Sequence, residues 1–165
     1  MRHWIVSATI ALAGGGPALA APAAAPELNS CHGGICSWSI TRARTLVRQD
    51  GTGILHRLSL LGGTAGEGSR RIRWQRQPHD VFIFCSSNLP TVILRVESRW
   101  QADVIDFVTG PPSYMESSAS LYMRTCHPGE DMAAPGFATR HGYQVEDPDQ
   151  NITLTRPEDI FLYPH

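Results

Sequence analysis

The chain contains no lysine, so all 14 of its Lys-or-Arg residues are arginines, against 15 acidic residues and a formal net charge of −1. A charge so close to zero excludes a polybasic nucleic-acid packaging protein and a strongly acidic solvating tail. Only four cysteines occur among 165 residues, too few for a cysteine-rich miniprotein. Hydrophobic residues make up 42% and charged residues 18%, which is typical of a globular protein.

Familiar catalytic and cofactor motifs are also missing. The sequence has no Gly-x-Ser-x-Gly nucleophile elbow and no His-Glu-x-x-His metal helix. It has no Cys-x-x-Cys pair, which redox enzymes and many zinc sites use, and no Cys-x-x-Cys-His for covalent haem. We therefore expect no metal site, no cofactor and no assignable catalytic residue.

Residues 1–20 have the order of a secretory signal peptide. A short positive start precedes an apolar run over residues 5–13, a Gly-Gly-Gly-Pro breaker and an Ala-Leu-Ala cleavage site at 18–20. The apolar run is shorter than the roughly 20 residues needed to span a bilayer about 30 Å thick. We expect cleavage after residue 20 and a secreted or periplasmic protein.

The remainder divides into a linker and one domain. Residues 21–30 are rich in proline and alanine, lack periodicity and predict a linker with nothing to bury. Residues 31–165 predict a single disulfide-stabilised, β-rich domain of ordinary size. No second long apolar run occurs in the sequence, so we expect no membrane span.

Four cysteines follow the predicted cleavage site, and export favours two disulfides. Three pairings are possible. We favour Cys31 with Cys36, because a Gly-Gly pair lets the short segment between them turn, and Cys85 with Cys126, which end an expected strand and an expected helix. The rival arrangement joins Cys36 to Cys85 and Cys31 to Cys126.

Short apolar or alternating segments bounded by turn residues indicate strands. They cover residues 36–41, 54–61, 72–74, 81–85, 91–96 and 100–108, with a late strand at 151–155. Gly62-Gly63 is expected to end the second of them. The segment 81–85 is continuously apolar, which predicts a strand covered on both faces.

The hydrophobic period then changes to that of a helix. Ser113 and Glu116 have the spacing of a capping box, and an apolar stripe continues to Cys126 before His-Pro-Gly ends the helix. Since no helices alternate with the strands, a parallel sheet is disfavoured. The predicted fold is mainly β (α+β): an antiparallel sandwich or partly open barrel with one helix packed on it.

Charge is divided along the chain. Residues 31–100 hold 10 arginines and 4 acidic residues, whereas residues 101–165 hold 3 arginines and 10 acidic residues. One interpretation is that the two halves meet and neutralise each other. The other is a basic surface that binds carboxylates or phosphates. Its candidate binding residues are Arg70, Arg71, Arg73 and Arg76.

Trp74 lies among these arginines. Side chains alternate along a strand, so Trp74 is expected to point away from Arg71 and Arg73 into the core. An aromatic platform interleaved with basic side chains is therefore disfavoured, and with it a nucleic-acid partner. We expect the partner to be an anionic envelope component or another protein.

Two near-motifs are incomplete. The segment Gly63–Ser69 has the glycine spacing of a phosphate loop, but the lysine that should follow is absent. The segment Asp147–Glu158 resembles the calcium loop of EF-hand proteins over twelve residues, but Ile152 stands where that loop needs glycine. We expect an ordinary loop in the first segment and a solvated acidic turn in the second.

These observations predict an exported binding or interaction module of the cell envelope or extracellular space. The alternative is a small secreted hydrolase that uses a turn histidine, either His79 beside Asp80 or His127 near Glu130 and Asp131. A structural envelope protein without a ligand is a third interpretation. Convergence of these groups on one pocket would favour the hydrolase.

Overall fold

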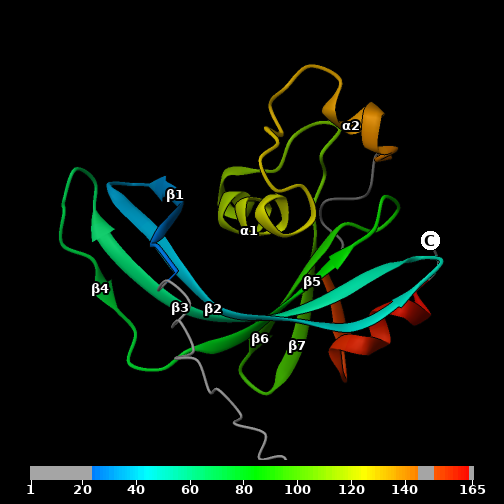
Figure 1. The fold of residues 1–165 in the computed structure, drawn as a ribbon, viewed down its shortest axis with the longest axis horizontal. Coiled ribbons are helices and arrows are strands. Elements are labelled where there is room, and N and C mark those ends of the chain that lie inside the picture. The colour runs from blue at the N-terminus through cyan, green and yellow to red at the C-terminus, as the bar shows by residue number, and fades with distance from the viewer. Residues whose placement is uncertain (1–23, 145–150, 164–165) are drawn as a thin grey trace, which may run out of the picture.

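A computed structural model describes residues 24–144 and 151–163 of the protein. Its strands form one open antiparallel sheet in the order β1-β2-β3-β5-β6-β7-β8, with β4 also paired to β3 (Figure 1). The strands are β1 (Glu27–His32), β2 (Ile35–Asp50), β3 (Gly53–Gly66), β4 (Arg73–Trp74), β5 (His79–Cys85), β6 (Thr91–Val96), β7 (Arg99–Val104) and β8 (Asn151–Leu154). The helical elements are η1 (Ser113–Met115), α1 (Glu116–Cys126), α2 (Phe137–His141) and η2 (Pro157–Leu162).

The expected mainly β fold with one main helix on an antiparallel sheet is confirmed. The described strands belong to one open sheet rather than to the two layers of a sandwich. α1 lies over one face of this sheet, and η2 lies on the other side (Figure 1). Within the described residues, no helix combines the length and apolar character needed to cross a bilayer.

Each face of the sheet has its own core. In β5, Val81 and Ile83 belong to the cluster packed under α1, whereas Phe82 and Phe84 belong to the cluster on the η2 side. The ring of Phe84 meets that of Phe161 of η2 edge-on, with centroids 4.9 Å apart. Burying each such side chain stabilises the fold by about 1.5–3 kcal/mol. The continuous apolar run over residues 81–85 is explained by this two-sided cover.

β3 is longer than expected because Gly62 and Gly63 do not end it. A Cβ at Gly63 would lie 2.6 Å from a ring carbon of Trp74, and one at Gly62 would lie 3.1 Å from the Gln75 side-chain oxygen. The two glycines therefore let the β4 segment lie directly against the β3 backbone. Trp74 is half-buried there and lies outside both core clusters, which corrects its expected place in the core.

The helix begins differently from the expected capping box. Ser113–Met115 forms a turn of 3₁₀ helix in which the Met115 N–H donates to the Pro112 carbonyl over 2.8 Å, and α1 starts only at Glu116. No side-chain cap bonds to the first turn of α1. The preceding turn of helix satisfies the backbone instead. The apolar stripe itself is confirmed, since Met115, Ala119 and Tyr122 are buried.

Two disulfides join the favoured pairs of cysteines. Cys31 is bonded to Cys36 within the β1–β2 hairpin, and Cys85 at the end of β5 is bonded to Cys126 at the end of α1. The first closes a hairpin of five residues' separation, whereas the second spans 41 residues and ties the helix to the sheet. The rival pairing is therefore not the one in this structure.

The predicted linker at residues 21–30 ends earlier than expected, because β1 begins at Glu27. The Glu27 carboxylate lies 2.9 Å from the Arg124 Nε, and the Asn29 side-chain oxygen accepts hydrogen bonds from Arg124 and from Ser39. The two contacts with Arg124 join segments more than 90 residues apart in the sequence, so no local pattern predicts them. The predicted signal peptide at residues 1–20 lies outside the described residues.

Candidate functional site

Three adjoining pockets open along the sheet on the side of the molecule that carries β4. The central pocket, about 420 Å³, lies between α1 and strands β2 and β3. Its polar lining consists of Asn29, Ser37, Ser39, Thr64, Arg73, Gln75, His79, Ser117 and Ser118, with Trp38 and Leu60 among the apolar residues.

The second space, which we call the arginine pocket, shares Arg73 and Thr64 with the central pocket. It measures about 590 Å³ and is lined by Arg71 and Ser69 as well. Ser69 Oγ accepts a hydrogen bond from the Arg71 N–H over 3.2 Å, which shapes the turn that carries both residues. Arg71 and Arg73 both line this space, as expected for residues two apart in an extended segment.

The third space, which we call the tryptophan pocket, measures about 490 Å³ and shares Gln75, His79 and Leu94 with the central pocket. It also contains Trp100, whose ring lies 5.6 Å from the Arg95 guanidinium carbon. The three volumes are each within the range of small-ligand sites. Because neighbours share lining residues, the pockets form a row that suits an extended ligand.

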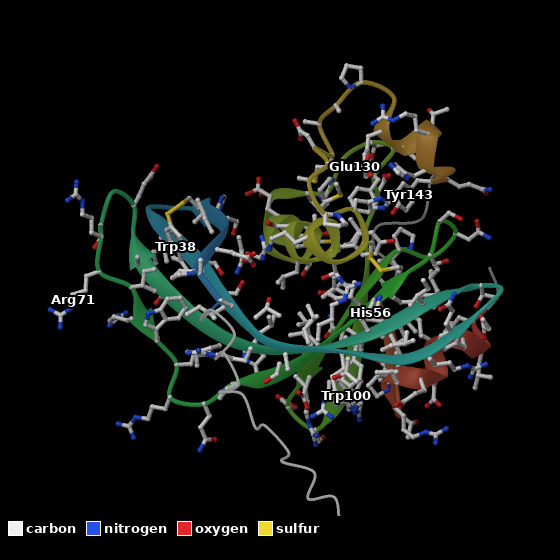
Figure 2. The ribbon with its side chains drawn as sticks, viewed as in Figure 1. Trp38, His56, Arg71, Trp100, Glu130 and Tyr143 are labelled. Carbon is white, nitrogen blue, oxygen red and sulfur yellow. A yellow bond between two sulfur atoms is a disulfide. The ribbon has the colours of Figure 1, made fainter. Side chains whose placement is uncertain are left out.

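The four candidate arginines do not act as one group. Arg71 and Arg73 line the arginine pocket, whereas Arg70 and Arg76 line none of the three pockets. Figure 2 shows Arg71 at the end of the molecule near β4, on the same side as Trp38 and far from Glu130 and Tyr143. The sequence thus identified the segment 70–76, but in the fold only Arg71 and Arg73 line a pocket, and Arg70 and Arg76 lie outside the three pockets.

In the part of the chain that the structure describes, the two halves do not neutralise each other through direct ion pairs. Among the described residues, no arginine of 31–100 pairs with an acidic residue of 101–165. Arg48 and Arg57 instead pair with Asp50 and Asp80 on the same half.

The four candidate arginines have no carboxylate partner among the residues that the structure describes. Within residues 24–144 and 151–163, none lies within ion-pair distance of Arg70, Arg71, Arg73 or Arg76. All four side chains are exposed. They are therefore available to an external anion.

The two turn histidines lie in different pockets. His79 lines the central and tryptophan pockets, and its neighbour Asp80 is engaged by Arg57, whose Nη2 lies 2.7 Å from the Asp80 carboxylate. No carboxylate lines the central pocket. His127 lines a separate pocket of about 160 Å³ beside the Cys85–Cys126 disulfide. The convergence that would favour a hydrolase is therefore absent between these two histidines.

The fold surrounds His127 with groups that the sequence did not connect to it. Glu130 Oε1 lies 3.5 Å from His127 Nδ1, and His141 Nε2 lies 2.9 Å from Glu130 Oε2. His127 Nε2 lies 2.6 Å from the Tyr143 hydroxyl, and the Tyr143 hydroxyl donates to the Tyr122 hydroxyl over 3.0 Å. Asp131 instead accepts the Ala133 N–H and takes no part in this cluster.

Burial controls the ionisation of this cluster. It lowers the pKa of His127, helped by the nearby His141 and opposed by Glu130. Burial likewise raises the pKa of Tyr143 to about 12 and that of Tyr122 well above its usual value, so both hydroxyls stay protonated at neutral pH. The hydrogen bond from His141 is the main cause that lowers the pKa of Glu130.

His141 is the residue that sequence analysis missed. The spacing His127-x2-Glu130-x10-His141 is a weak signal, because a Pro-Gly turn and several irregular residues intervene. Only the course of the chain from α1 to α2 brings its imidazole to Glu130. A search for paired histidines around a carboxylate within 15 residues is the pattern that finds it.

Of the two near-motifs, the structure describes the first completely and the second only from Asn151 onward. Gly63–Gly66 continues β3 and pairs with β2, so these glycines serve the sheet rather than a phosphate. Asp147 and Asp149 lie outside the described residues. From Asn151 onward the segment forms β8 and then η2, with Ile152 and Leu154 buried.

Comparison of the chain with family models, with curated proteins and with solved structures finds no match. Two places in the described structure have side chains suited to binding a ligand or an ion. They are the row of pockets that contains Arg71 and Arg73, and the cluster around His127.

Proposed function

We propose that the protein is an exported binding protein for a carboxylate-bearing glycan of the cell envelope or extracellular space. The single observation that carries this proposal is the pair Arg71 and Arg73, two exposed arginines that line one pocket without an acidic partner among the described residues. Guanidinium groups bind carboxylates through two parallel hydrogen bonds, and such charge-assisted bonds are stronger than neutral ones.

The remaining lining favours a sugar over a lipid or a protein surface. The central pocket next to Arg73 offers hydroxyl and amide groups from Ser37, Asn29, Gln75 and Ser117, which suit the hydroxyls of a saccharide. A lipid headgroup would bring an acyl chain that needs a continuous apolar channel, and the polar side chains interrupt one. The row of three pockets supports an oligosaccharide of several units.

The two disulfides and the expected export also support an acidic glycan as the ligand. Two disulfides persist in oxidising compartments, where acidic glycans are among the available anions. Mass spectrometry of the native protein should find Ala21 as the first residue. An N-terminus that retains Met1 would contradict the export.

The test is titration calorimetry of the purified chain with short oligogalacturonates, with neutral malto-oligosaccharides of equal length as the control ligand. Arg73→Glu and Arg71→Glu should each weaken binding of the acidic oligomer about 10- to 100-fold, the equivalent of one charge-assisted hydrogen-bonded pair. Arg70→Glu and Arg76→Glu make the same change of charge outside the pockets and should weaken it less than about threefold.

Equal effects of all four substitutions would contradict binding in the arginine pocket. They would show that the ligand is held only by long-range attraction to the positive charge. Equal affinity for the acidic and neutral oligomers would contradict recognition of the carboxylate. Shortening of the oligomer during the titration would favour the hydrolase hypothesis, and His79→Ala would then be the variant to compare.

A further inference from the structure

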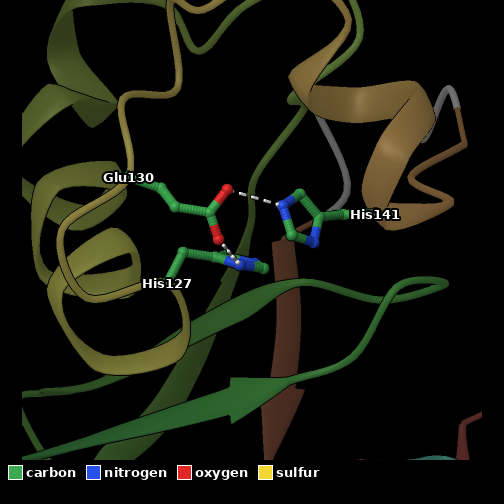
Figure 3. A group of neighbouring side chains, drawn as sticks. All are labelled: His127, Glu130 and His141. Carbon is green, nitrogen blue, oxygen red and sulfur yellow. Dashed lines mark hydrogen bonds and ion pairs between the residues drawn. The ribbon is translucent and has the colours of Figure 1, made fainter.

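A second site of different chemistry lies at the far end of α1. His127 follows the last residue of α1, Glu130 lies in the turn after it, and His141 ends α2 (Figure 3). One ligating atom from each of the three residues lies within 4.8 Å of those from the other two. Two imidazoles and one carboxylate are a common set of protein ligands for Zn²⁺.

The hydrogen bonds behind His127 fix which of its nitrogens carries the proton. The Tyr122 hydroxyl donates to the Ser86 carbonyl over 3.1 Å, and the Tyr143 hydroxyl donates to Tyr122. Tyr143 has then used its only hydrogen, so the 2.6 Å contact with His127 Nε2 requires this nitrogen to be the donor. The unprotonated nitrogen of the neutral imidazole is therefore Nδ1.

This tautomer leaves two acceptors facing each other. His127 Nδ1, with its lone pair, lies 3.5 Å from the Glu130 Oε1 atom, which also has only lone pairs to offer. Such a pair is satisfied by a cation that both atoms can bind. The tyrosine pair thus acts as an outer shell that orients His127, the role that hydrogen-bonded partners of metal-binding histidines usually have.

We propose that His127 Nδ1, Glu130 and His141 Nε2 form a binding site for a divalent zinc-class ion. Bonds of about 2.1 Å in a tetrahedron separate the ligand atoms by about 3.4 Å, which shifts of about 1 Å in the exposed Glu130 and half-buried His141 side chains would reach. With an ion on Nε2, the His141 ring would carry its proton on Nδ1 instead, and Glu130 would exchange this hydrogen bond for a bond to the ion. The fourth position would open toward the pocket beside Ser87 and the Cys85–Cys126 disulfide.

The surroundings hold the cluster in place, with one opposing charge. The Cys85–Cys126 disulfide fixes the residue before His127, and the His127 ring meets Phe137 of α2 edge-on at 5.2 Å between centroids. Arg140 Nη2 lies 3.9 Å from the Glu130 carboxylate and competes with a metal ion for it. Because the Arg140 side chain is about half exposed, it can turn into solvent when an ion binds.

The experiment uses the full chain without a histidine tag, freed of metal by chelation and titrated with ZnCl₂ in a calorimeter. We expect one ion per chain and a melting temperature raised by about 5–10 °C when zinc is 100-fold above its Kd. Cobalt(II) in place of zinc should give the intense visible absorption of a four-coordinate ion with nitrogen and oxygen ligands.

The decisive variants are Glu130→Gln and His141→Ala, since both positions are at the surface or half-buried and should fold normally. Each should weaken zinc binding at least 10-fold, whereas His79→Ala and His32→Ala, which change histidines outside the cluster, should leave it unchanged. His127→Ala also removes packing against Phe137. Its zinc affinity is therefore interpreted only if circular dichroism shows that the variant is folded. Binding weaker than millimolar, or binding that survives both decisive variants, would overturn the proposal and leave a protonated His127 as the cation beside Glu130.

Discussion

The two disulfides should differ in the stability that they contribute, because they close loops of very different length. In the chain-entropy model, a cross-link stabilises by restricting the unfolded chain, and the effect grows with the logarithm of the loop. Cys85 and Cys126 are 41 residues apart, which corresponds to about 4 kcal/mol. Cys31 and Cys36 are five residues apart, which corresponds to about 2 kcal/mol.

The perturbation is a pair of double substitutions, Cys85→Ala with Cys126→Ala and Cys31→Ala with Cys36→Ala. Urea unfolding followed by circular dichroism measures the free energy of unfolding of each protein. With an m-value of about 1.5–2 kcal/mol/M, the two variants should have midpoints about 1 M apart. The m-value should rise most in the variant without the long loop, because its unfolded chain expands most.

Packing contributes to both variants. Cys85 and Cys126 are half-buried and pack against the core beneath α1, whereas Cys31 is exposed and Cys36 is buried. Each double substitution therefore loses some apolar contact in addition to the cross-link, and the difference between the variants comes from loop length. Equal midpoints for the two variants, or a larger loss from the short hairpin, would refute the reasoning from loop length.

Two further predictions concern the sheet and its acid stability. Gly63→Ala should destabilise the protein by about 1–3 kcal/mol, because its Cβ would overlap the Trp74 ring, whereas Gly66→Ala meets nothing within 4 Å and should change the melting temperature little. An equal effect of both would contradict the packing of Trp74. Burial tends to raise the pKa of Asp106, but hydrogen bonds from Thr109 and Val108 outweigh it and hold this pKa below 3.8. Asp106 thus stabilises the fold above that pH, and the contribution is lost as the pH falls through the folded-state pKa. In the Asp106→Asn variant, the melting temperature should therefore fall less steeply as the pH drops below about 4. The same steepness in the variant and the unsubstituted protein would contradict this role of Asp106.

The features that the sequence predicted correctly depend on the spacing of apolar residues over short stretches of the chain. The run at 81–85 is apolar at every position, and its residues are indeed divided between two cores. The stripe that ends at Cys126 has helical spacing, and its buried members face the sheet. A strand end and a helix end that carry cysteines are placed together by this packing, which is why the favoured pairing agrees with the structure.

The features that were missed depend on contacts between distant segments. Nothing near Gly62 and Gly63 shows that Trp74 will lie on them, so a pair of glycines predicts the end of a strand. Glu27 and Asn29 sit in a Pro/Ala-rich stretch, and their place in the sheet comes from the pairing of their strand with β2 and from contacts with the distant Arg124 side chain. His141 likewise joins Glu130 only through the irregular path between α1 and α2.

α1 connects the two proposed sites, the central pocket and the cluster around His127. Its first turns supply Ser117 and Ser118 to the central pocket, and the residue after its end is His127. The helix is held to the sheet at several points along its length, so its orientation is over-determined. These links are the Ser30–Ser117 hydroxyl contact of 2.6 Å, the Arg124–Glu27 ion pair, the Tyr122–Ser86 hydrogen bonds and the Cys85–Cys126 disulfide.

Such multiple attachment is what a site needs from its scaffold, because side chains are aimed only as well as the element that carries them. The links also differ in kind, so their loss should have separable effects. Breaking the Ser30–Ser117 contact frees β1 from the first turn of α1 and from the wall of the central pocket, at the end of the helix that the disulfide does not reach. Breaking the disulfide frees the opposite end, where His127 depends on Cys126 and on the Tyr122 hydroxyl beside it. Glycan binding should therefore respond more to the first change and zinc binding more to the second, although both act on one helix of 11 residues.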